Sequence, residues 1–177
     1  MKLIPMIMMF ASLSESAMEV KLNCGMSLDG DVNMAKNPIV LNSESKNSEY
    51  FSTFLGWDHN NSIIVSLNKS ASLCSDSGCK EMSGTIYTLS LVRLENPVRK
   101  AQQLESDYRE KVRGTTSATI EFTQRTDGSP MQADFMENGK LVYNSTRMPE
   151  SISIDYSVTR GVLKERQQIG FKCEIQI

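Results

Sequence analysis

The chain has 177 residues, a formal net charge of −2 and an isoelectric point near 5.5. Proteins that bind nucleic acid present strongly basic faces, so this charge balance argues against nucleic acid as a partner. No charge block, low-complexity tract or internal repeat divides the sequence. Its length and its share of hydrophobic residues therefore predict one domain with its own core.

The first sixteen residues have the composition of a secretory signal peptide. Lys2 provides a short positive region, residues 3–13 form an apolar run, and small and polar residues follow from Ser14 to Ala17. Pro5 interrupts the run, which is shorter than the ~20 apolar residues that span a bilayer. We expect residues 1–16 to be removed on export to the periplasm or the extracellular space. Residues 17–177 then form a single mature domain with no transmembrane segment.

After the leader, apolar and polar residues alternate with period two, which is typical of strands with one buried face. The clearest alternation lies at residues 21–28, 151–158 and 169–177. Less regular runs lie at 38–42, 50–56, 62–68, 83–94, 117–126, 131–137 and 140–145. This pattern predicts an all-β domain.

The turn residues indicate how some of these strands are connected. Asn138-Gly139 provides the two positive φ angles of a type I′ turn, and residues 126–130 form a longer loop before it. The segment 117–145 is therefore predicted to be a three-stranded antiparallel meander. Regular short strands of this kind form a barrel, for which a lipocalin-like architecture is our hypothesis, or a sandwich.

One segment departs from the strand pattern. Asn96 and Pro97 have the residue types of a helix start, and Leu104, Tyr108 and Val112 recur at helical spacing. The sequence therefore predicts one amphipathic helix over about 97–113, with a structural role at an open end or edge of the sheet.

The four cysteines suggest disulfides in an oxidising compartment. Cys24 and Cys173 occupy inward positions of the first and last predicted strands, so a bond between them would join the ends of the domain. Four residues separate Cys74 from Cys79 in a polar segment, and proximity favours their pairing. Neither a structural zinc site nor a thioredoxin-like site fits these spacings.

No motif in the sequence predicts a cofactor or a metal. The single histidine, His59, lies in a polar segment that we interpret as a turn, without a recognisable nucleophile motif. Residues 29–33 resemble the start of a calcium loop, but Met34 and Val40 stand where glycine and glutamate are required. We therefore expect no catalytic residue, no metal and no cofactor.

A cluster of aromatic residues is the strongest candidate for a binding site. Tyr50, Phe51, Phe54 and Trp57 lie within eight residues, between a stretch rich in asparagine and serine and a polar segment. Aromatic rings next to polar loops are common at binding surfaces, because they bury much area at little entropic cost. The alternative is an ordinary core strand in which Phe51 or Phe54 faces inward.

These observations favour an exported, non-catalytic binding protein. Its ligand would be an apolar small molecule inside a barrel, or a protein partner bound at the loop rim. A secreted hydrolase with an unrecognised site, or a structural protein of the envelope or surface, is the alternative. Asn60, Asn68 and Asn144 begin glycosylation sequons, which have meaning only in a eukaryotic secretory pathway.

The leader gives the first testable prediction. The mature protein is expected to begin between Ser12 and Glu19 and to be found outside the cytoplasm, because the signal peptide is removed during export. N-terminal sequencing of the protein from separated cell fractions measures both its first residue and its location. Recovery of Met1 on soluble cytoplasmic protein would contradict the prediction.

Overall fold

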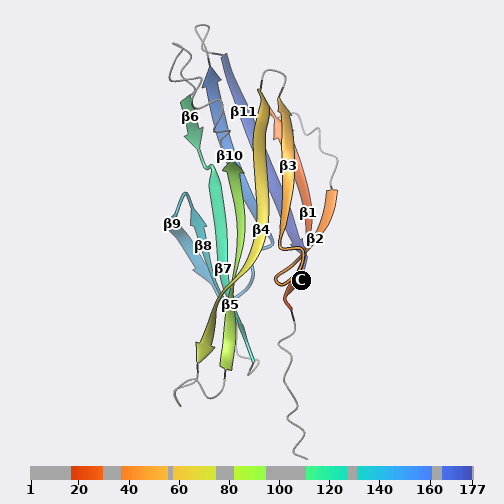
Figure 1. Cartoon of the computed structure of the whole chain (residues 1–177). Coiled ribbons are helices and arrows are strands. Elements are labelled where there is room, and N and C mark those ends of the chain that lie inside the picture. The colour runs from red at the N-terminus through yellow and green to blue at the C-terminus, as the bar shows by residue number, and fades with distance from the viewer. Residues whose placement is uncertain are drawn as a thin grey trace, which may run out of the picture.

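The computed structural model describes residues 17–29, 37–55, 58–74, 82–94, 111–126, 131–160 and 165–176. Every regular element in this part of the chain is a β-strand (Figure 1). The strands are β1 (Glu19–Leu28), β2 (Asn37–Asn42), β3 (Ser48–Leu55), β4 (Asp58–Cys74), β5 (Met82–Leu94), β6 (Lys111–Gly114), β7 (Ser117–Arg125), β8 (Gln132–Glu137), β9 (Lys140–Ser145), β10 (Ser151–Arg160) and β11 (Glu165–Gln176).

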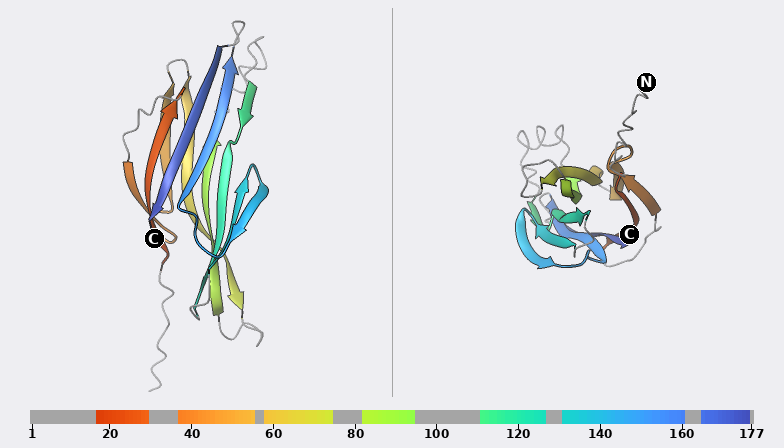
Figure 2. Two further views of the ribbon diagram at one scale, coloured as in Figure 1. Left: turned by 180° about the vertical axis from the view of Figure 1, so that it is seen from behind. Right: turned by 90° about the horizontal axis from the view of Figure 1, so that it is seen from below.

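The strands form two antiparallel sheets that pack face to face (Figure 2). The first sheet has the order β2-β1-β11-β10-β6, and the second has the order β3-β4-β5-β7-β8-β9. The first sheet therefore combines strands from both ends of the described chain with the short strand β6, whereas the second sheet is built entirely from the middle of the chain.

The core lies between the two sheets and follows the alternation of the sequence. Ile152, Ile154, Tyr156 and Val158 of β10 are buried, and a similar series lines the inner face of β7. Phe51 of the second sheet packs against Phe171 of the first, with ring centroids 5.0 Å apart. Interdigitation of the two inner faces is the usual way in which facing sheets fill their core.

The chain crosses between the sheets on both sides of the core. On one side, Ser43 N still donates to Met18 O, next to β1, while Asn47 O accepts from Leu67 N of β4. On the other side, Thr115 N donates to Asp155 O of β10, and Thr116 O accepts from Arg93 N of β5. Two consecutive residues therefore belong to different sheets.

These crossings correct the barrel hypothesis. A closed barrel requires hydrogen-bonded ladders around its whole circumference, but the two ladders here end at β2 and β6 and at β3 and β9. The lipocalin-like barrel is therefore wrong, and the two facing sheets correspond to the sandwich alternative. The physical reason is that the chain turns across the core at residues 43–47 and 115–116, where it leaves one ladder for the other.

The meander and its hairpin are confirmed, and β7, β8 and β9 are neighbours in that order. Asn138 and Gly139 have φ angles of 48° and 74°, as the type I′ turn requires. β4 is longer than predicted, because it includes residues 58–61 and continues to Cys74. The backbone of His59 therefore lies in a strand, and its predicted position in a turn is wrong.

The predicted helix falls largely outside the described residues, which resume at Lys111. Its last three residues, 111–113, belong to β6 and pair with β10, so the predicted end of the helix is wrong. Pairing with β10 gives these residues a tertiary partner that local helical periodicity does not reveal.

The disulfide between Cys24 and Cys173 is confirmed, and it joins directly opposite residues of β1 and β11. Cys74 is also disulfide-bonded. Its expected partner, Cys79, lies outside the described residues.

Replacing Cys24 and Cys173 together by alanine should lower the free energy of unfolding by about 4–5 kcal/mol, because the bond closes a loop of 149 residues. The matched pair Cys74→Ala and Cys79→Ala should cost only about 2 kcal/mol, because any loop that it closes is short. Urea unfolding measures both differences. An equal loss in the two variants would contradict the assignment of the larger effect to the terminal strands.

Candidate functional site

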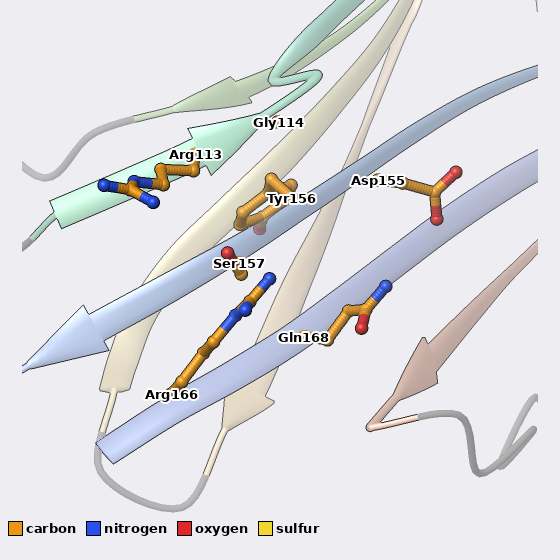
Figure 3. Close-up of a pocket in the computed structure, with 7 residues that line it drawn as sticks. All are labelled: Arg113, Gly114, Asp155, Tyr156, Ser157, Arg166 and Gln168. Atoms are coloured by element: carbon orange, nitrogen blue, oxygen red, sulfur yellow. The ribbon is translucent and has the colours of Figure 1, made fainter. Parts of the chain in front are cut away.

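A polar hollow of about 170 Å³ lies on the outer face of the first sheet, across β6, β10 and β11 (Figure 3). Its lining combines two arginines, a carboxylate, hydroxyls and an amide: Arg113, Gly114, Asp155, Tyr156, Ser157, Arg166 and Gln168. We call it the basic hollow, because its two cations, Arg113 and Arg166, form no ion pair with any residue that the structure describes.

The strand register places the polar side chains of the basic hollow. Ser157 of β10 lies opposite Arg113 of β6 and Gln168 of β11. Directly opposite residues of neighbouring strands point to the same face of a sheet. Because Tyr156 faces the core, these three residues face outward.

The next outward row adds more positive charge. Thr159 of β10 lies opposite Lys111 of β6 and Arg166 of β11. Lys111, Arg113 and Arg166 are all exposed. In the described part of the chain, no carboxylate forms an ion pair with either arginine.

The carboxylate of Asp155 lies at the other end of the basic hollow. A Cβ placed on Gly170 would lie 2.7 Å from Asp155 Oδ1 and 2.5 Å from Ser27 Oγ, so both oxygens occupy the space over this glycine. In Figure 3 the side chain of Asp155 points away from Ser157, toward which Arg166 extends. The hollow therefore has a basic end and an acidic end.

Gly114 allows β6 to end against β10 and cross to the second sheet. Its φ of +109° is rarely adopted by residues with a side chain, and a Cβ there would overlap the carbonyl oxygen of Asp155. The crossing is held from the other sheet by Asn138. The side chain of Asn138 donates to Gly114 O at 3.1 Å and accepts from Thr116 N at 2.9 Å and Ser117 N at 3.2 Å.

The structure separates the described members of the predicted aromatic cluster. Tyr50 is exposed on the outer face of β3, whereas Phe51 is half-buried on the inner face against Phe171. Phe54 lies in β3, but the structure describes only its backbone. Trp57 lies outside the described residues. The roles proposed for Phe54 and Trp57 stay predictions.

A second surface of interest is the edge strand β9. Leu141 is 61% exposed, Val142 is 53% exposed, and Tyr143 is also exposed. A β-bulge at Val142 separates the pairs Phe135–Tyr143 and Met136–Leu141, and it turns Leu141 and Tyr143 to opposite faces. The Tyr143 ring stacks on Phe135 with centroids 5.1 Å apart. We call Leu141, Val142 and Tyr143 the β9 edge.

The described edges of the sheets differ in their protection against new strands. β2 contains Pro38, which cannot donate to a further strand, and it lies beside β3. β6 has only four residues. β9 has six residues and a more apolar surface, with Lys140 and the bulge as its protective features. Sequence reasoning missed this edge, although three consecutive apolar residues in a strand cannot all face one core.

Within the described residues there is no helix long and apolar enough to cross a membrane, and no group of three or more potential ligands is placed to hold a metal ion. No family model, curated protein or solved structure matches this chain.

Gly114→Ala should lower the free energy of unfolding by about 3 kcal/mol, because the new Cβ combines an unfavourable φ with overlap against β10. Gly139→Ala is the matched control, since its φ is also positive but nothing lies within 4 Å of a Cβ. It should cost only about 1 kcal/mol. Chemical denaturation measures both. Similar losses would show that the close approach at Gly114 has no energetic effect.

Proposed function

We propose that this chain is an exported, non-catalytic binding protein whose partner is another protein, bound at the β9 edge. The observation that supports this proposal is the exposure of Leu141, Val142 and Tyr143 on a strand that has a neighbour on one side only among the described strands. Contiguous exposed apolar residues commonly mark interaction sites, whereas isolated ones are ordinary.

The filled interior favours a surface site over an internal ligand. Large side chains from both sheets occupy the space between them and are fully buried, among them Phe122, Tyr156 and Phe171. Protein interiors of this kind are close-packed, with little empty space for an apolar ligand. The filled interior therefore favours a binding site on the outside of the sandwich over one inside a barrel.

The β9 edge offers two kinds of interaction to a protein. Among the described strands, none lies beyond β9 in the sheet, so an extended segment can pair with its outer backbone groups. Its side chains add apolar contacts, and full burial of such a side chain contributes about 1.5–3 kcal/mol. Leu141 and Tyr143 lie on opposite faces of the sheet, so a segment paired with β9 can make apolar contacts on both of its faces.

An extended segment of another protein fits this edge better than a second copy of the chain. The bulge at Val142 and the charge of Lys140 are features that discourage two rigid sheet edges from joining. In a symmetric pair each edge would contain the same bulge. A flexible segment can adjust its backbone to one bulge, and its side chains can contact the exposed rings and aliphatic groups.

Export is supported by the signal-like N-terminus and by the Cys24–Cys173 disulfide, which is consistent with an oxidising compartment. A binding module that works outside the cytoplasm gains from this bond, because the bond constrains the unfolded chain.

A photo-crosslinking residue at Val142 should form a specific crosslink to a partner in the native source, whereas the same residue at Val40 should not. Val40 is the matched control because it is 44% exposed on the edge strand β2 of the other sheet. Leu141→Asp should weaken binding of the identified partner by at least about 1 kcal/mol and abolish the crosslink. Hydrogen exchange should show protection of the β9 amides in the complex.

Equal crosslinking from both positions would contradict a specific site at the β9 edge. A crosslink to a second copy, together with a dimer in solution, would contradict the proposed kind of partner and replace it with self-association.

A further inference from the structure

We propose that the basic hollow binds a small oxyanion group, such as a carboxylate, a phosphate or a sulfate. This site lies on the outer face of the first sheet, whereas the β9 edge belongs to the second. The proposal is therefore independent of the protein partner.

The first argument is the uncompensated positive charge. Arg113 and Arg166 line the hollow, and Lys111 lies in the same outward row as Arg166. Neither arginine forms an ion pair within the described residues. Cations gathered at one place repel one another, and a bound anion removes this repulsion.

The second argument is geometric. β6 and β11 flank β10, so Arg113 and Arg166 are carried on the two sides of the strand that holds Ser157, within a strip about 10 Å wide, which is two strand spacings. Arg166 extends toward Ser157, whereas the side chain of Arg113 runs along β6 and away from Ser157 (Figure 3). Exposed arginine side chains of this length can turn to share one ligand, and planar guanidinium groups bind oxyanions through paired hydrogen bonds.

The third argument is a buried donor within the lining. Ser157 is only 5% exposed, yet it lines the hollow between the two arginine-bearing strands. Its hydroxyl and the side-chain amide of Gln168 are both capable of donating hydrogen bonds, and an oxyanion offers acceptors to all of these groups. The donors and the cations therefore select the same ligand chemistry.

Asp155 restricts where the ligand lies. Its carboxylate occupies the space over Gly170 and would repel an anion there. The oxyanion is therefore directed to the end of the hollow that holds Arg166 and Ser157. A larger ligand that also has a cationic group would place that group toward Asp155.

The test is a titration of the isotope-labelled protein with phosphate, sulfate and acetate at constant ionic strength, followed by NMR. Amide signals of β6, β10 and β11 around Ser157 should shift together and saturate. Arg166→Gln and Arg113→Gln should each weaken binding about tenfold, because each removes charge-assisted hydrogen bonds. Ser157→Ala should cause a smaller loss.

Lys172→Gln is the matched control. Lys172 is an exposed cation on the same outward face, opposite Gly25 and Ser153 and away from the lining of the hollow. Its replacement removes the same charge and should change the affinity less than about twofold, since exposed charges beyond a Debye length are largely screened. A melting temperature for each variant verifies that it is folded.

Saturable binding of acetate assigns the site to carboxylates, and preference for phosphate or sulfate assigns it to those dianions. The proposal is overturned if none of the three anions shifts the β10 signals of the wild-type protein. It is also overturned if Lys172→Gln weakens binding as much as Arg166→Gln, because the effect would then be general electrostatics. Neither outcome of the anion titration changes the crosslink expected at Val142, so the two proposals are tested separately.

Discussion

The pairing of β1 with β11 is the constraint on which the rest of the structure depends. It joins the first and last described strands in antiparallel register, and the Cys24–Cys173 disulfide covalently fixes that register. Both cysteines lie in the core, so the bond is surrounded by the side chains that hold the two sheets together. Because these contacts join residues far apart in the sequence, loop-closure entropy opposes the first sheet until most of the chain is in place.

The closure of the first sheet from both ends determines the course of the middle of the chain. After β2 the chain leaves the first sheet at residues 43–47 and forms β3, β4 and β5 of the second sheet. It rejoins the first sheet as β6 and leaves it again at residues 115–116 to form β7, β8 and β9. A one-residue shift at a crossing would turn every inward side chain of the next strand outward. The bonds of Asn138 to Gly114, Thr116 and Ser117 hold the second crossing in register.

This crossing also connects the two candidate surfaces. Gly114 lines the basic hollow, and Asn138 begins the turn between β8 and β9. Thr115 Oγ1 donates to Glu137 Oε2 at 3.2 Å, which adds a further contact between the crossing and β8. The hollow and the β9 edge are thus supported by one set of hydrogen bonds, although they lie on different sheets and are proposed to bind ligands of different chemistry.

The sequence by itself determined the all-β class, most strand positions, the turn at Asn138-Gly139 and the pairing of Cys24 with Cys173. These features depend on local periodicity, on turn stereochemistry and on the inward position of each cysteine within its own strand, and each of these can be read from a short segment of the sequence. Only the tertiary structure decided that the sheets stay open, that residues 111–113 join β10, and that Tyr50 and Phe51 face opposite ways. It also brought Arg113, Ser157 and Arg166 to one face and left Leu141 and Val142 exposed. The physical reason is that strand order and register come from long-range pairing, which determines the neighbours of each side chain and is not written in any one segment.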